Sequence, residues 1–130
     1  LKDFPNTVVD VQIYILQADA STRVAGINAA SMALAQAGIP MKDLVCAVAI
    51  GKMDKDLVVD VDKDEEDFED GEGATDIPLA RMANSDEFTL FQLDGKIQPE
   101  MIPKALALAD KAFAKIYEVQ KKALKEVQSE

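Results

Sequence analysis

Three polar residues stand together at the start of an otherwise apolar segment. Ser21, Thr22 and Arg23 precede a run of mostly Ala, Met, Val, Ile and Leu that reaches Ala37, and Gly38 follows it. This pattern predicts a helix over residues 22–37, with Ser21 or Thr22 as its N-cap and the glycine just past its end. A helix this apolar, with side chains this small, is expected to be buried and to pack closely against a sheet.

Two interpretations of this helix start are open. The first amide groups of a helix have no partner inside it, and the helix dipole adds partial positive charge there. With the charge and donor fork of Arg23 and the hydroxyls of Ser21 and Thr22, the position is suited to bind a phosphate group. Alternatively, a hydroxyl only caps the helix, and Arg23 is an ordinary surface arginine.

A second group of residues suited to chemistry lies in an acidic segment. Residues 54–76 contain 12 of the 24 acidic residues and only two lysines. Such a charge run is commonly a solvated loop, but carboxylates at its edges could act as a general acid or as Mg²⁺ ligands. Asp76 is the better-ordered candidate, because it precedes Ile77 and Pro78, where the chain is expected to re-enter the sheet.

Composition excludes several other kinds of site. The 130 residues include no His and one cysteine, Cys46, which rules out a His-based triad, a His or Cys zinc site and an internal disulfide. The net charge of −10 argues against broad binding of a phosphate backbone by the chain as a whole. Apolar runs fall far short of the ~18 residues typical of a membrane helix, and the lone cysteine favours a cytoplasmic setting.

Hydropathy patterns predict the elements that must position these residues. Five segments have the length and composition of strands: residues 8–16, 44–52, 57–62, 77–83 and 87–95. Residues 63–76 are expected to form a loop. A short first turn and then a regular helix from about Pro103 should end the chain. The apolar face of that helix is predicted to comprise Leu106, Ala109, Phe113, Ile116, Val119 and Leu124. The element order favours a single α+β or mixed α/β domain.

The run LQADASTRVAGINAASMALAQAGIPMKDLV, followed by AIGK, VVDV, EED and ATDIP, resembles the ribonuclease PH family. The resemblance covers essentially the whole chain. The small-residue helix ending in AGIPM and the ATDIP element make it specific. Within the family, the sequence resembles the C-terminal half of the catalytic ring subunit of the archaeal exosome.

The resemblance implies an α+β, ribonuclease PH-like fold, also described as ribosomal protein S5 domain 2-like. Helices should pack on a mixed sheet, with residues 1–130 forming the C-terminal half of a single domain. The implied function is a phosphate-dependent 3′-to-5′ exoribonuclease subunit of the exosome ring, which phosphorolyses RNA 3′ ends to nucleoside diphosphates. Inorganic phosphate would be the co-substrate and Mg²⁺ a candidate cofactor. The alternative is a non-catalytic scaffold subunit of the same ring.

The resemblance also implies roles for particular residues. Phosphate would bind at Ser21, Thr22 and Arg23, and the catalytic carboxylates would be Asp67, which closes the EED motif, and Asp76. The acidic loop is longer than the family's pattern, so Glu66 competes with Asp67 for the first role. Ser21 stands where the family has glycine, and it is strained if that position requires a positive φ. Metal ligands are not identified.

The resemblance finally implies partners. These are RNA, the protein's own N-terminal half, an inactive paralogous ring subunit in a heterohexamer, and RNA-binding cap subunits. No membrane is expected among them.

Overall fold

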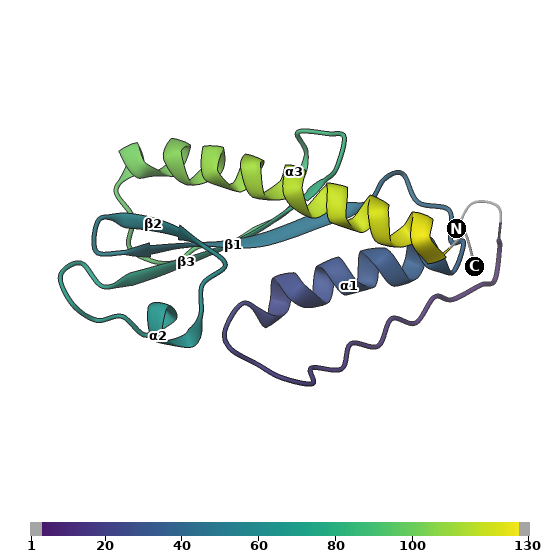
Figure 1. Ribbon diagram of the computed structural model, residues 1–130, viewed down its shortest axis with the longest axis horizontal. Helices are drawn as coiled ribbons and strands as arrows, with labels where there is room; N and C mark the ends of the chain where they lie inside the picture. Colours follow the sequence, from purple (N-terminus) through teal and green to yellow (C-terminus); the bar gives the residue numbers. More distant parts are fainter. Residues whose placement is uncertain (1–3, 128–130) are drawn as a thin grey trace.

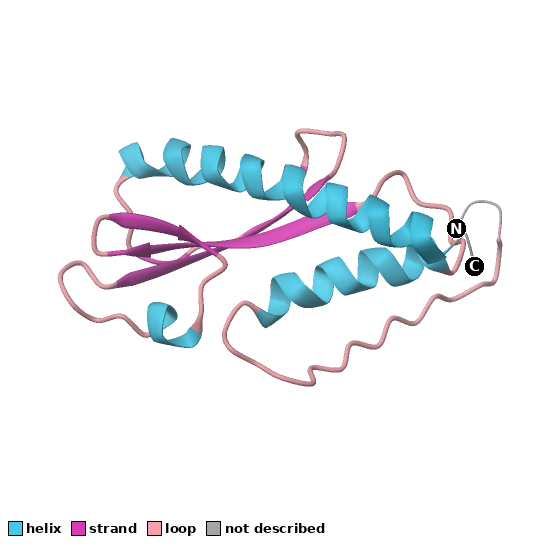
Figure 2. Cartoon of the chain, in the orientation of Figure 1, coloured by secondary structure: helices cyan, strands magenta, loops and turns pink. Residues whose placement is uncertain are grey.

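A computed structural model describes residues 4–127, in which two long helices lie on opposite faces of one sheet (Figures 1 and 2). The elements, in chain order, are α1 (Thr22–Gln36), β1 (Val45–Met53), β2 (Asp56–Val59), α2 (Lys63–Glu66), β3 (Ala74–Met82), β4 (Phe88–Phe91), β5 (Asp94–Gly95), a 3₁₀ turn (Pro99–Met101) and α3 (Ile102–Val127). None of the helices in residues 4–127 is long and apolar enough to cross a membrane.

The sheet has the order β2-β1-β3-β4, and β5 also pairs with β3. Every pairing in this part of the chain is antiparallel, where a mixed sheet was predicted. The central strand β1 alternates its side chains between the two helices. Cys46, Val48 and Ile50 pack toward α3, whereas the smaller Ala47 and Ala49 pack toward α1. The small side chains on the second face allow α1 to approach the sheet closely.

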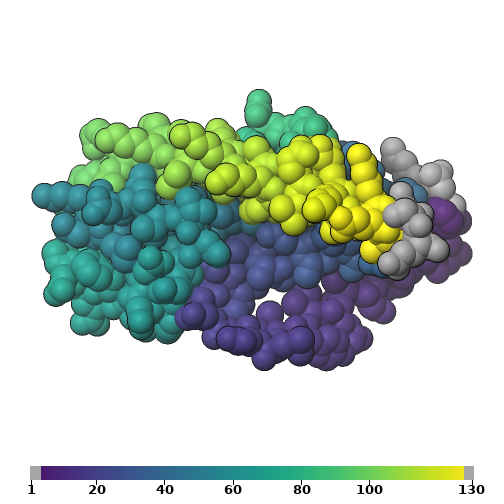
Figure 3. Space-filling model, viewed as in Figure 1, coloured from purple at the N-terminus to yellow at the C-terminus, as the bar shows by residue number. Residues whose placement is uncertain are grey.

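The segment at residues 8–16 is not a strand, contrary to the prediction. It runs extended along α1 on the side away from the sheet, and the space-filling view shows a hollow between the two (Figures 1 and 3). A strand needs a hydrogen-bonded neighbour, and the described residues place none beside it. Side chains of the segment differ in their surroundings: Ile13, 52% exposed, approaches Gly26 of α1, whereas Leu16 is 97% exposed.

Helix α1 is less buried than its composition predicts. Val24, Gly26 and Ser31 are buried against the sheet and the extended segment, but Ala25, Ala29 and Ala33 are exposed. These three alanines are four residues apart, so they share one face of the helix. The prediction that this helix is buried is therefore wrong for that face.

Side-chain amides complete the hydrogen bonding of β1 where β2 does not reach. The Asn28 side chain accepts from the Ala47 amide at 2.9 Å and donates to its carbonyl at 2.8 Å. The Gln120 side chain donates to the Val45 carbonyl at 3.1 Å and to Asn28 at 3.3 Å. The apolar face predicted for α3 is therefore wrong at Val119, which is 68% exposed, while its neighbour Gln120 is buried. An amide is needed there because the strand edge carries polar backbone groups.

Two further predictions are corrected by local structure. The predicted loop at residues 63–76 contains the short helix α2, which begins with a capping box: Asp62 accepts from the Glu65 amide, and the Glu65 carboxylate accepts from the Asp62 amide. The single strand predicted at residues 87–95 is split into β4 and β5. The split lies opposite Pro78, whose nitrogen has no hydrogen to donate to the ladder.

The predicted helix ends are confirmed. Gly38, with φ 71°, closes α1 through hydrogen bonds from Gly38 to Ala35 and from Ile39 to Leu34. At the other end of the chain, the 3₁₀ turn at Pro99–Met101 leads directly into α3 at Ile102.

Candidate active site

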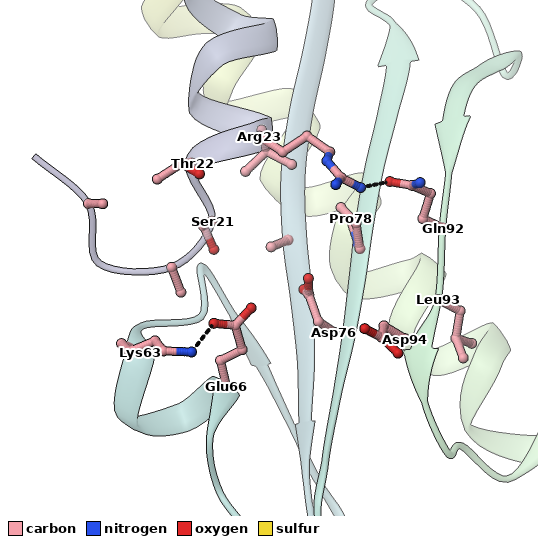
Figure 4. A pocket seen from close by; sticks show the side chains of 14 residues that line it. Ser21, Thr22, Arg23, Lys63, Glu66, Asp76, Pro78, Gln92, Leu93 and Asp94 are labelled. Atoms are coloured by element: carbon pink, nitrogen blue, oxygen red, sulfur yellow. Dashed lines mark hydrogen bonds and ion pairs between the residues drawn. The ribbon is translucent and has the colours of Figure 1, made fainter. Parts of the chain in front are cut away.

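A pocket of about 580 Å³ opens at the amino end of α1, on the sheet face that α1 covers (Figure 4). Its floor is formed by Ala49 of β1 and Pro78 of β3, whose side chains are small or compact. Its polar walls come from four places: the α1 start, α2, β3, and the β4–β5 connection. The phosphate-binding candidates and most of the carboxylate candidates therefore meet here, although they are distant in sequence.

The start of α1 is held by its turn rather than by a hydroxyl cap. Ser21 has φ 50° and ψ 13°, so the positive φ considered from the sequence is present in a non-glycine residue. Its hydroxyl does not cap the helix but donates to the Val61 carbonyl at 2.8 Å. The Asp19 carboxylate accepts from the Lys63 amide at 3.2 Å. These two bonds fasten the turn before α1 to the segment that leads into α2.

Arg23 reaches across the pocket from the first turn of α1. Its Nη1 donates to the side-chain oxygen of Gln92, in the connection between β4 and β5 (Figure 4). This acceptor is a neutral amide, so it directs the guanidinium without cancelling its charge. The charge acts on Asp76, where it opposes the rise in pKa that burial causes.

Asp76 is a half-buried carboxylate on the pocket side of β3. Its Oδ1 is buried and has no hydrogen-bond partner among the described residues. Burial raises the pKa of Asp76, and the negative charges of Glu66 and Asp94 raise it further. The charge of Arg23 and a hydrogen bond from the Ile77 amide oppose the rise. Asp94 lies directly across the β3–β5 pairing from Asp76, so two carboxyl groups share this part of the wall.

Glu66 lines the pocket, whereas Asp67 does not. Both carboxylates bind Lys63, which lies 3.0 Å from Glu66 and 2.7 Å from Asp67. The Asp67 side chain is 63% exposed against 36% for Glu66. The capping box fixes the start of α2, and in the turn that follows it is Glu66, not Asp67, that lines the pocket. Of the residues singled out from the sequence, the pocket thus brings together Ser21, Thr22, Arg23, Asp76 and Glu66.

Two other kinds of site, a metal site and a cysteine nucleophile, can be checked against the described residues. The described residues contain no group of three or more His, Cys, Asp or Glu side chains placed to hold a metal ion. Binding of Mg²⁺ therefore remains a prediction. Cys46 is buried, and burial raises the pKa of its thiol to about 11, which makes it a poor nucleophile near neutral pH.

Comparison with known proteins decides the family. A model described as "3′ exoribonuclease family, domain 2" matches residues 43–112, and one described as "3′ exoribonuclease family, domain 1" matches residues 1–40. The chain belongs to the 3′ exoribonuclease family. The first match includes α2, β3 and the β4–β5 connection, and the second includes the α1 start, so both contribute residues to the pocket. The ribonuclease PH resemblance predicted from the sequence is confirmed.

Individual members of the 3′ exoribonuclease family are similar over nearly the whole chain. Exosome complex component Rrp41 of Thermococcus gammatolerans is 51% identical over 126 residues, which are 97% of this chain and 49% of that protein. The protein of the same name from Nitrosopumilus maritimus is 46% identical over 124 residues, 95% of this chain and 49% of that protein. The chain spans about half the length of the curated relatives it matches.

The fold of this family is also found in a solved structure. The crystal structure of rice (Oryza sativa) Rrp46 matches with a TM-score of 0.72 and 24% identity, over 82% of this chain and 49% of that one. This likeness concerns the fold alone. The predicted α+β, ribonuclease PH-like fold class is confirmed.

Three pocket residues were missed in the sequence: Lys63, Gln92 and Asp94. Alternation along residues 87–95 places Gln92 and Asp94 on one face, which was a usable signal. Their position beside Asp76 depends on how this segment pairs with β3, and no local pattern specifies that. Lys63 was concealed by the assumption that the acidic segment has no helix.

Proposed function

We propose that this chain forms part of a phosphate-dependent 3′-to-5′ exoribonuclease subunit of an exosome ring. The observation that supports this most strongly is the composition of the pocket. Arg23 and the α1 amino end face a half-buried carboxylate, Asp76, across one cavity. The first group suits an attacking phosphate, and the second suits a proton transfer beside it.

The proposed reaction is phosphorolysis of the last phosphodiester of RNA. An oxygen of orthophosphate attacks the phosphorus of that bond, and the bond from phosphorus to the 3′ oxygen of the preceding nucleotide breaks. The leaving oxygen takes a proton, and the terminal nucleotide departs as a nucleoside diphosphate. Positive charge at the α1 start would hold the attacking phosphate against the repulsion of the RNA backbone.

The leaving oxygen requires an acid within reach. Asp76 is suited to this role because burial, Glu66 and Asp94 all raise its pKa and favour the protonated form. Glu66 is the second carboxylate that we place in the site, in preference to Asp67, which lies outside the pocket. The motif-based assignment to Asp67 is thereby replaced in this proposal by the alternative left open in the sequence.

The pocket has few cations for RNA phosphates, and this shortage indicates that other protein parts contribute to RNA binding. Its cations are Arg23 and Lys63, and Lys63 is already paired with Glu66 and Asp67. With Asp76 and Asp94 also in the pocket and a net charge of −10 on the chain, RNA phosphates need cations from elsewhere. We propose that these come from the rest of the subunit, including an N-terminal half that covers the exposed segment at residues 8–16. A paralogous ring subunit and RNA-binding cap subunits would complete the assembly, in the cytoplasm.

The decisive experiment follows nucleoside diphosphate release from a 3′-labelled RNA by the assembled ring, with and without inorganic phosphate. We expect release only with phosphate, and a loss of at least ~100-fold in kcat/KM for Arg23→Ala, since a charged donor in such a site contributes several kcal/mol. Lys111→Ala, which removes an exposed cation of α3, is the matched control and should retain activity.

Two outcomes would count against the proposal. Nucleoside monophosphates released without phosphate would indicate hydrolysis. No release in any condition, from a ring that assembles normally, would favour the non-catalytic scaffold.

A further inference from the structure

We propose that Gln92 is a positioning residue that holds the Arg23 guanidinium over the pocket and thereby sets the affinity of the site for orthophosphate. This inference rests on the function proposed above. No role was predicted for Gln92 in the sequence analysis, and the residue acts through Arg23 rather than on the reacting atoms.

The backbone at Gln92 is placed by the sheet. The residue lies between β4, which ends at Phe91, and β5, which begins at Asp94. Its amide donates to the Pro78 carbonyl at 3.1 Å. Pro78 cannot return a hydrogen bond, so the ladder is interrupted at this pair while its register continues from Leu79–Phe91 to Asp76–Asp94. Gln92 is thus anchored beside Asp76 without being part of a continuous strand.

The side chain of Gln92 faces the pocket and meets Arg23 there. Figure 4 shows the guanidinium extended from α1 across the cavity to the amide oxygen, above Pro78 and Asp76. Arginine loses considerable rotamer freedom when it is held in one orientation, and an unassisted Arg23 would spend most of its time in solvent. A fixed acceptor on the opposite wall lowers the cost of ordering it when an anion binds.

The chemical nature of the acceptor matters as much as its place. A guanidinium has five N–H donors, and the Gln92 oxygen accepts from Nη1, so the planar group keeps further donors for a tetrahedral oxyanion. A carboxylate in the same position would orient Arg23 equally well but would neutralise the charge that attracts phosphate. The neutral amide therefore orients the Arg23 guanidinium without compensating its charge.

The test compares Gln92→Met and Gln92→Glu in the assembled ring, with Gln36→Met at the exposed far end of α1 as the matched control. Steady-state rates give kcat, KM for inorganic phosphate and KM for RNA, and thermal unfolding reports the fold. For Gln92→Met, we expect KM for phosphate to rise about three- to tenfold, the usual net size of one intramolecular hydrogen bond, since this bond is exposed to solvent. KM for RNA and the melting temperature should remain unchanged.

The second variant separates positioning from charge. Gln92→Glu should raise KM for phosphate about tenfold or more at low salt, and this defect should shrink at high salt as the new carboxylate is screened. The defect of Gln92→Met should not depend on salt. A Gln92→Met ring with a normal KM for phosphate, or with both KM values raised alike, would overturn the inference. A wild-type ring that does not require phosphate would instead overturn the proposed function.

Discussion

Gly51 marks the place where the sheet leaves room for the segment that leads to α2. It pairs with Asp76 across β1 and β3. A Cβ at this position would lie 2.5 Å from Cγ2 of Val61 and 2.9 Å from Cγ2 of Val58. Both distances are too short for carbon atoms, so Gly51→Ala must push Val61 outward. The Val61 carbonyl accepts the Ser21 hydroxyl, so the displacement should also disturb the start of α1.

The structure allows the size of this effect to be estimated. Overpacking of this kind costs about 1–3 kcal/mol of unfolding free energy. Val61→Ala alone should cost about 2 kcal/mol, because it removes two methyl groups from a buried side chain. In the double variant, the nearest remaining atom of residue 61 is its Cβ at 3.6 Å, an ordinary contact, but the 2.9 Å approach to Cγ2 of Val58 remains and still requires a small shift of that side chain. Because only one of the two short contacts is removed, the double variant should be about 1 kcal/mol more stable than the sum of the single changes predicts.

Urea unfolding of the subunit that carries this sequence is measured for the wild type, Gly51→Ala, Val61→Ala and the double variant. Gly51→Ala with Val45→Ala is the matched control, because six residues of strand separate these positions by about 20 Å. That pair should be additive within about 0.5 kcal/mol. If Gly51→Ala and Val61→Ala are also additive, the close approach of these two residues does not govern the position of the segment.

Three further predictions concern the pocket. Glu66→Gln should reduce RNA degradation at least ~100-fold while Asp67→Asn leaves most of it, as measured by diphosphate release; the reverse result would restore Asp67 to the site. Asp76 has a raised pKa, so its stabilising contribution is present below its ordinary pKa of 3.8 and is lost as pH rises through the raised value. Asp76→Asn should therefore raise the melting temperature at pH 7 but progressively less toward pH 3.8, while activity falls; an equal gain at both pH values would contradict this. Gly95→Ala should cost about 2 kcal/mol and impair activity, because φ is 117° and the new Cβ would lie 2.7 Å from the Ala74 carbonyl oxygen, beside Asp94; wild-type unfolding in urea would refute it.

Local signals were sufficient for much of the fold. The glycine that ends α1, the strands predicted at residues 44–52 and 57–62, and the short turn that leads into a helix near Pro103 each depend on residues close in sequence, and the structure contains each of these elements. The helix α2 could also have been predicted, because Asp62 and Glu65 have the spacing of a capping box.

What the sequence could not specify depends on distant partners. The alternating segment at residues 8–16 has the pattern of a strand, but a strand forms only where another chain segment hydrogen-bonds to it. Gln120 interrupts an apolar pattern because the unpaired edge of β1 requires an amide, and that edge is visible only in the folded structure. The neighbours of Asp76 in the pocket also depend on distant segments, since strand pairing brings Asp94 and Gln92 beside it.

We propose above that the amino end of α1, with Arg23, binds orthophosphate beside Asp76. The most direct measurement is the electron density in crystals of the assembled ring soaked in inorganic phosphate. We predict a tetrahedral feature in this pocket, within hydrogen-bonding distance of the Arg23 guanidinium and of the first amides of α1. A pocket without such density, with Arg23 turned away into solvent, would contradict phosphate binding at this site.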